Sequence, residues 1–412
     1  MEQIDALFLE ALRAALEDRQ VNWGVDVTPE QMFDVVRLSQ EHHVLPLIFE
    51  AIYSCSATTN MDGVLFMQCK RTTVQAVMTQ AIKTEDFLRL NRHLRQNGIT
   101  PLVVKGIVCR NLYPRPDYRV SGDEDVLCGE HQFKECHKAM ISFGMEPGTS
   151  SLDSYEVPYS RDDSPLYIEL HKTLFSQDSD IFSDCNRFFE GCFDRLVEID
   201  VQGDPVATLN HTDHLLYLIL HAFKHFLHSG FGIRQVCDMV LFANTYGESI
   251  EWEYVLTKCK GLRADKFAAA LFAIGEKYLV FSPEKACYPH AWRKLQVNPD
   301  ELLQDMLRGG IYGYSERSRM HSSNMTLNAV SADKKGKRSG GNLLRTIFPP
   351  VRNMEGKFPY LRRMPFLLPV AWASRIVGYA KETITEQNSS ASDVLRIGSQ
   401  RIELLRQYDI ID

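Results

Sequence analysis

Apolar residues recur at helical spacing through most of the first hundred positions. The pattern predicts four helices, with apolar stripes over about residues 4–15, 32–38, 44–52 and 64–94. Thr28 followed by Pro29 is typical of a helix N-cap and first helical position, and Asn97-Gly98 of a helix end. We therefore expect an N-terminal helical region over residues 1–98.

The pattern then changes to short runs of β-branched and aliphatic residues. These runs predict a small α/β core over residues 99–205, because strands favour such residues in clusters of a few positions. The expected strands are Pro101–Val104, Val126–Cys128, Ser154–Tyr159 and Leu166–Leu170, with a helix over Phe133–Phe143.

Helical spacing returns over residues 206–295, where a helix capped by Asn210 or Thr212 and running to about Leu227 is apolar on most sides. Residues 296–412 lose periodicity and begin as a mobile polar loop. Its basic cluster at 334–341 is interpreted as solvated, although it could touch substrate phosphates. A Pro-interrupted apolar helical region and a closing helix over Ser389–Tyr408 follow. The expected fold class is α+β, a small mixed-sheet core embedded in helical N-terminal and C-terminal regions.

Composition narrows the classes of partner. The formal net charge of −7 argues against a broad electrostatic grip on nucleic acid. Ten cysteines without CxxC pairs exclude a zinc ribbon and fit a reducing compartment. The N-terminus is acidic and amphipathic, unlike a signal peptide, and no apolar run reaches the ~18 residues that span a bilayer. A cytoplasmic protein is expected.

The candidate chemistry lies between the first two strands of the core. Side chains alternate along a strand, so Asp123 and Asp125 share one face and Glu124 points away. Two carboxylates on one face repel each other unless a cation sits between them, and Mg²⁺ is commonly held this way together with substrate phosphates. Lys105-Gly106, at the start of a helix, could receive those phosphates.

Lys105-Gly106, Leu112-Tyr113-Pro114, Arg119 and Gly122-Asp123-x-Asp125-x-Leu127 together resemble the uncharacterised nucleotidyltransferase family of the DNA-polymerase-β-like superfamily. The resemblance extends loosely over residues 80–379. It implies two-metal transfer from a nucleoside triphosphate to a hydroxyl, with Asp123 and Asp125 as metal ligands and Lys105 and Gly106 at the phosphates. One departure is that Ile107, not Ser or Gly, follows Gly106, so a phosphate-binding hydroxyl is missing.

The resemblance also implies that Glu169 is the third metal carboxylate. Glu169 interrupts an apolar run, where a carboxylate is costly unless it is paired or bound to metal. The alternative is a solvated strand edge, with Glu169 paired to Lys172 or Arg161. His171, two positions on, could face the same cleft.

Three further groups have open interpretations. His221 and His225 are one helical turn apart, which is the spacing of a zinc site, but a polar stripe that lines the cleft is favoured. The resemblance implies that these histidines support the site. Arg119 either contacts the nucleotide or pairs with Asp117 or Asp123. Arg234 and Asp238 are expected to form an i,i+4 ion pair.

The predicted function is metal-dependent nucleotidyl transfer from a nucleoside triphosphate, with Mg²⁺ or Mn²⁺, to a hydroxyl acceptor and with release of pyrophosphate. A small molecule or a protein is favoured as acceptor over long nucleic acid. The alternatives are a catalytically weak or inactive nucleotide-binding module of the same fold and a His-dependent metal phosphohydrolase.

Overall fold

The computed structural model describes residues 2–228, 230–309 and 391–412, with short pieces between 326 and 374. The basic cluster at 334–341 lies outside the described residues. The helices named below are α1 Gln3–Leu16, α2 Pro29–Glu41, α3 Leu45–Ile52, α4 Gly63–Gln96, α5 Gly106–Arg110, α6 Phe133–Ser142, α7 His211–Leu227, α8 Ile233–Tyr246, α9 Trp252–Gly261, α10 Asp265–Tyr278, α11 His290–Arg293, α12 Pro299–Gly309 and α16 Ala391–Gln407. The strands are β1 Leu102–Val104, β2 Glu124–Leu127, β3 Glu146–Pro147, β4 Glu156–Arg161, β5 Ser164–His171, β6 Val197–Val201 and β7 Asp204–Thr208.

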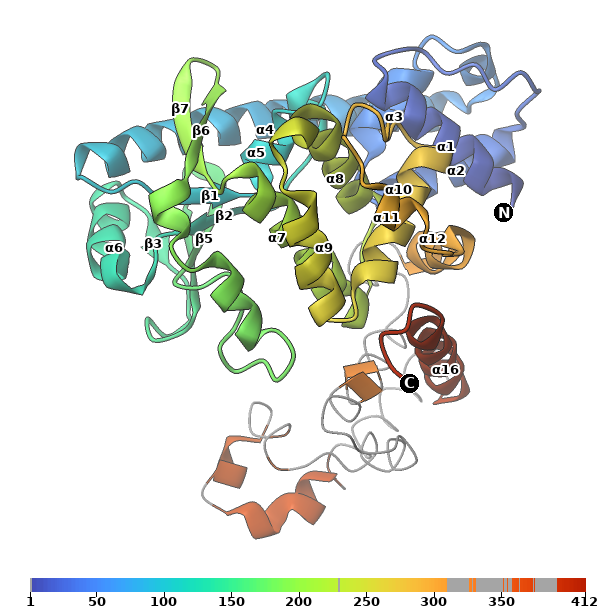
Figure 1. Cartoon of the computed structure of the whole chain (residues 1–412). Helices are drawn as coiled ribbons and strands as arrows, with labels where there is room; N and C mark the ends of the chain where they lie inside the picture. Colours follow the sequence, from blue (N-terminus) through green and yellow to red (C-terminus); the bar gives the residue numbers. More distant parts are fainter. Residues whose placement is uncertain are drawn as a thin grey trace.

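The strands form one mixed sheet in the order β3-β4-β5-β2-β1-β7-β6. Strand β2 pairs antiparallel with β1 and parallel with β5, so it lies at the centre of the sheet. In the β2–β5 pair Asp125 stands opposite Glu169, and Leu127 stands opposite His171. The fold is therefore the expected mixed sheet with helical regions on either side, as Figure 1 shows.

The two faces of the sheet pack against different helices. Val103, Val126 and Ile168 belong to a core shared with α4 and α6, whereas Leu102, Val104 and Leu127 join the larger core of α7 to α12. Because side chains alternate along a strand, Asp125 lies on the same face as Leu127, and Glu169 on the face opposite to Ile168. Both carboxylates consequently face α7.

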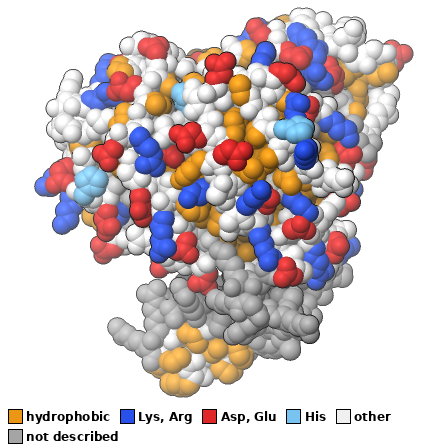
Figure 2. All heavy atoms as spheres, viewed as in Figure 1, with side chains coloured by type: hydrophobic (Ala, Val, Ile, Leu, Met, Phe, Trp, Pro, Cys, Tyr) orange, Lys and Arg blue, Asp and Glu red, His pale blue; other side chains and the backbone are white. Residues whose placement is uncertain are grey.

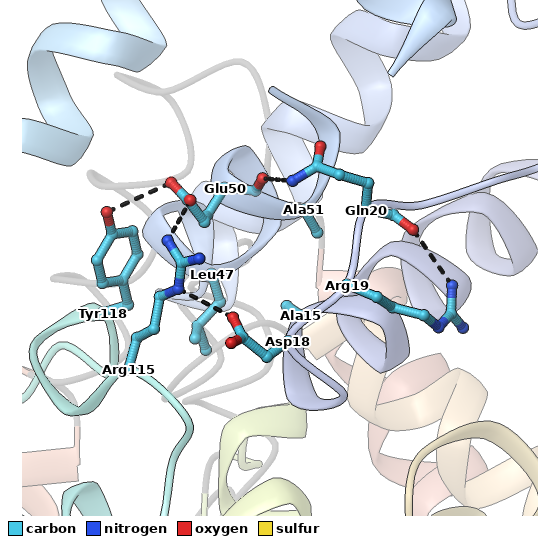
Figure 3. Close-up of a pocket in the computed structure, with 9 residues that line it drawn as sticks. All are labelled: Ala15, Asp18, Arg19, Gln20, Leu47, Glu50, Ala51, Arg115 and Tyr118. Atoms are coloured by element: carbon cyan, nitrogen blue, oxygen red, sulfur yellow. Dashed lines mark hydrogen bonds and ion pairs between the residues drawn. The ribbon is translucent and has the colours of Figure 1, made fainter. Parts of the chain in front are cut away.

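The N-terminal helices hold the segment that leads into β2. Thr28 caps α2 as expected, through a reciprocal capping box with Gln31. Arg115, next to the short 3-10 turn Pro116–Tyr118, donates to Asp18 at 2.9 Å and also pairs with Glu50 of α3. Figure 3 shows this arginine between the two carboxylates, beside a cavity of about 30 Å³.

Two features of the fold are absent from the expectations. Strands β6 and β7 form a hairpin, and β7 pairs with β1. The sequence did not predict this hairpin, because charged residues alternate with Val197, Ile199 and Val201 in β6 and Pro205 interrupts β7. Helix α12 occupies a region expected to lack periodicity, although it buries Leu302, Leu303, Met306 and Leu307 at helical spacing. The closing helix is present as α16, and Arg401 joins it to the end of α7 through the carbonyls of Phe226 and His228.

The described residues also bear on partners. All ten cysteines are free. None of the helices described is both long and apolar enough to cross a bilayer. The face drawn in Figure 2 mixes acidic and basic side chains and gathers no broad patch of one sign.

Candidate functional site

Two carboxylates and one imidazole meet between the sheet and α7. The Asp125, Glu169 and His171 side chains offer ligand atoms that all lie within 4.8 Å of one another. His171 Nε2 is 3.1 Å from Asp125 Oδ1 and 3.8 Å from Glu169 Oε2. The parallel pairing of β2 with β5 produces this group, because it sets Asp125 directly beside Glu169.

The electrostatics of the two carboxylates differ sharply. Burial, together with the charges of Asp125 and Asp123, raises the pKa of Glu169 to about 7. Burial acts in the same direction on Asp125, but the Lys105 ammonium and His171 outweigh it and hold the pKa of Asp125 well below its usual range. At neutral pH the site therefore has a fixed anion beside a group that can readily gain or lose a proton.

This donor set suits a hard divalent cation. Carboxylate oxygens are the ligands that Mg²⁺ and Mn²⁺ prefer. Burial, and then the charges of Asp125 and Asp123, raise the pKa of Glu169, and a bound cation would act in the opposite direction. An Nε2–H of His171 donates to Asp125, which orients that carboxylate. Asp125 and Glu169 are thus the residues that could hold an ion, with His171 beside them.

Asp123 lies just before β2, half-buried and outside this group of three. Its charge nevertheless contributes to the raised pKa values of Glu169 and Lys105. The preceding loop is anchored from α4, where Lys83 donates to the Ser121 and Gly122 carbonyls at 2.8 and 2.7 Å. The role of Asp123 as a metal ligand stays a prediction.

Lys105 has a backbone conformation that is rare outside glycine, with φ +56° and ψ −119°. Its N–H donates to His214 Nε2 at 3.1 Å, so the proton of that ring is on Nδ1, 3.0 Å from Thr208 Oγ1. The Thr208 hydroxyl in turn donates to the Val103 carbonyl. Burial lowers the pKa of His214 to about 3, which keeps it neutral in this chain of hydrogen bonds. Such strained residues persist only where their surroundings fix them.

The Lys105 ammonium lies between the carboxylate group and α7. Its Nζ is 2.7 Å from Asp125 Oδ2 and 2.9 Å from His221 Nε2. Because the ammonium donates, His221 Nε2 accepts from Lys105, and His225 Nε2 lies 3.2 Å from the same nitrogen. Burial and the Lys105 charge lower the pKa of both histidines. They line the cleft as neutral groups, and in the described part of the chain neither belongs to a group able to hold a metal.

Glu124 also belongs to the site, although the sequence predicted only that it points away from the face of Asp123 and Asp125. It is buried and accepts from the Ile107 N–H at 2.6 Å and from Arg110 at 2.9 Å. Gly106 is essential to this contact, since a Cβ at that position would lie 1.8 Å from Glu124 Oε2. A buried Glu between two Asp residues was the available signal, because such a carboxylate needs a partner.

Arg119 forms an ion pair, but with neither expected partner. Its guanidinium is 2.5 Å from Asp238 Oδ2, both side chains are 5% exposed, and Tyr113 Oη also donates to Asp238 at 2.8 Å. Asp238 thus pairs with Arg119 rather than with Arg234, which donates to the Val120 carbonyl. Arg119 ties the loop before β2 to α8.

The alternative ion pairs of Glu169 do not form. Lys172 donates to the Leu152 carbonyl at 2.6 Å and lies over the Phe133 ring, and Arg161 pairs with Asp163. Glu169 instead faces Asp125 and His171, as the metal interpretation requires.

Comparisons with known proteins identify a family for this chain. A family model described as an uncharacterised nucleotidyltransferase matches residues 28–279, more than half of the chain. The crystal structure of an antigenic nucleotidyltransferase-like protein from Paracoccidioides brasiliensis is 14% identical, with 50% of this chain and 96% of that chain covered. Its TM-score of 0.31 is too low to carry an argument. No curated protein matches the chain.

Proposed function

Because this chain belongs to the uncharacterised nucleotidyltransferase family, we propose that it moves a nucleoside monophosphate from a nucleoside triphosphate to a hydroxyl acceptor, releasing pyrophosphate. The acceptor is a small molecule or a protein hydroxyl. The net charge of −7 disfavours a long nucleic acid, and the face drawn in Figure 2 mixes acidic and basic side chains over the residues that the structure describes.

One observation carries the proposal. Asp125 and Glu169 are register partners on adjacent parallel strands, and their oxygens converge with His171 within 4.8 Å. Carboxylates brought this close are costly unless they serve a cation or a proton transfer. The family match and this convergence point to the same reaction class.

The chain's own residues have separable roles. Asp125 and Glu169, with Asp123 nearby, would hold Mg²⁺ or Mn²⁺, which when bound lowers the pKa of a hydroxyl and neutralises phosphate charge. Glu169, with a pKa of about 7, is suited to accept the acceptor's proton. Lys105 supplies positive charge beside the group as pyrophosphate leaves. His171 orients Asp125.

A second candidate is a nucleotide-binding module without turnover. Its supporting observation is the Lys105 ammonium at 2.7 Å from Asp125, a cation of the protein itself against the carboxylate that a metal would need. Such a module would bind nucleoside triphosphate and transfer nothing.

Labelled nucleotides distinguish these functions. The protein is incubated with Mg²⁺, a cell extract and nucleoside triphosphates labelled at the α or the γ phosphate. We expect α label on an acceptor and γ label in pyrophosphate. Asp125→Asn and Glu169→Gln should each reduce labelling by about a hundredfold or more, the usual scale for losing a group that stabilises the transition state.

Glu135→Gln is the matched control, because it removes an exposed carboxylate from α6. It should label the acceptor like the unmodified chain. Undiminished labelling by Asp125→Asn would refute the assigned site, and γ label on the acceptor would refute the reaction class. Nucleotide binding without any labelled product would favour the second candidate.

A further inference from the structure

The proposed function requires a grip on the triphosphate, and part of the glycine turn is already used within the protein. The Ile107 N–H, in the first turn of α5, already donates to Glu124 at 2.6 Å. Helix α5 has five residues, which gives it little dipole, and Ile107 supplies no hydroxyl. These features favour further phosphate contacts from another side of the site.

We propose that α7 and Lys105 form the triphosphate subsite, with Lys224 as its principal cation. This subsite rests on the proposed function and takes the polyphosphate of a nucleoside triphosphate. Lys224 is three positions after His221 and directly before His225, so all three lie toward one side of α7. Figure 1 shows that α7 stands beside the sheet strands that carry the carboxylates.

Lys224 is a partly buried ammonium without a counterion. It has no hydrogen bond or ion pair within the described part of the chain, whereas Lys105 is neutralised by Asp125. Burial, and then the neighbouring Lys105 charge, lower the pKa of Lys224, while Glu156, Asp125 and Glu169 act in the opposite direction. Its place on α7, three residues after His221, whose Nε2 is 2.9 Å from Lys105 Nζ, sets Lys224 about one helical turn from the group that contacts the carboxylates. A cation kept this way without a partner is costly unless an anion joins it.

The histidines complete the chemistry of this wall. His221 Nε2 is occupied as an acceptor, which leaves its Nδ1–H as a neutral donor. One side of the site has neutral N–H donors and ammonium groups, and the carboxylates lie across from them. This arrangement suits a ligand whose phosphate oxygens face the donors and whose bound divalent cation faces the carboxylates. Lys224 adds to this wall an ammonium that forms no hydrogen bond or ion pair with the residues that the structure describes.

Inorganic tripolyphosphate is the direct probe, since every nucleoside triphosphate shares this group. Its dissociation constant is measured by calorimetry with Mg²⁺ present. Lys224→Met keeps most of the length of the side chain and removes the charge, so the affinity should fall by about tenfold or more. Lys224→Arg retains the charge and should bind within about threefold of the unmodified chain, a rescue that a purely structural role would not require.

Lys138→Met, on the exposed side of α6, is the control and should leave the affinity unchanged. The proposal is overturned if the unmodified chain does not bind tripolyphosphate, or if Lys224→Met binds as tightly as Lys138→Met. Far-ultraviolet circular dichroism on each variant verifies that it is folded. If Lys224-dependent binding is observed without acceptor labelling, the transfer function fails and the subsite stands. If Lys224→Met labels the acceptor with an unchanged KM for the nucleotide, the transfer function stands and the subsite fails.

Discussion

The contact between Gly106 and Glu124 allows a sharp test of how the site is built. A Cβ added at Gly106 would lie 1.8 Å from Glu124 Oε2 and 2.8 Å from its Cδ, and Gly106 has a φ of +27°. Gly106→Ala must therefore either strain the turn or push Glu124 off the Ile107 N–H and Arg110. Both Arg110 and Glu124 side chains are 2% exposed, so water cannot compensate for the displacement.

The expected loss of stability follows from the strain in the turn and the displacement of Glu124. Backbone strain at positive φ contributes about 1–2 kcal/mol, and a buried donor left without its acceptor about 1–3 kcal/mol. Gly106→Ala should thus lower the free energy of unfolding in urea by about 2–5 kcal/mol, the upper end applying if the buried ion pair also breaks. Gly63→Ala is the control, because nothing lies within 4 Å of a Cβ there and its effect should stay within about 0.5 kcal/mol.

A double variant separates the backbone strain from the loss of the Glu124 contacts. Glu124→Ala combined with Arg110→Met removes the obstructing carboxylate and its buried partner together. In that background Gly106→Ala should cost only the backbone strain of about 1–2 kcal/mol. An equal cost in both backgrounds, or a loss below about 1 kcal/mol in the unmodified chain, would show that Glu124 does not hold the turn as described.

Three further results are expected. Mn²⁺ binding to the metal-free protein is followed by electron paramagnetic resonance and should tighten as pH rises through about 7. The raised pKa of Glu169 keeps this carboxyl group protonated below that pH, and Glu169→Gln should remove the pH dependence. Lys105→Met should tighten Mn²⁺ binding by about fivefold or more by removing a competing cation 2.7 Å from a ligand carboxylate, and unchanged affinity would refute that competition. Arg119→Met leaves Asp238 buried without its ion-pair partner and should cost about 3–5 kcal/mol in urea unfolding. Arg115→Met removes a side chain that is 44% exposed and should cost about 1 kcal/mol or less.

Local patterns predicted the elements well where each residue's position determined its environment. Thr28-Pro29 gave the start of α2 because capping is decided within four residues, and strand alternation correctly separated Glu124 from Asp125. The hairpin β6–β7 was not predicted, because strands with alternating charged residues resemble exposed loops in sequence. Whether a strand with one polar face pairs depends on a neighbour distant in sequence.

Partners across the site were harder to predict for the same reason. Arg119 and Asp238 are far apart in the chain, and they meet where the loop before β2 lies against α8. The expected Arg234–Asp238 pair had correct helical spacing, but a buried guanidinium from outside the helix offered Asp238 a stronger partner. Sequence spacing defines which residues can meet within one helix and is silent on contacts from elsewhere.

The central strand joins the stability of the fold to its chemistry. On one face of β2 Glu124 is tied to Arg110 and Ile107, and on the other Asp125 is tied to Lys105 and His171. A slip of one residue in the pairing of β2 with β5 would exchange these faces, placing Glu124 toward α7 and Asp125 in an apolar core. The buried Glu124 pair therefore selects the register that sets Asp125 opposite Glu169. Glu124 consequently contributes to the site without touching a ligand, because the same carboxylate that occupies the glycine turn also fixes where the other two carboxylates meet.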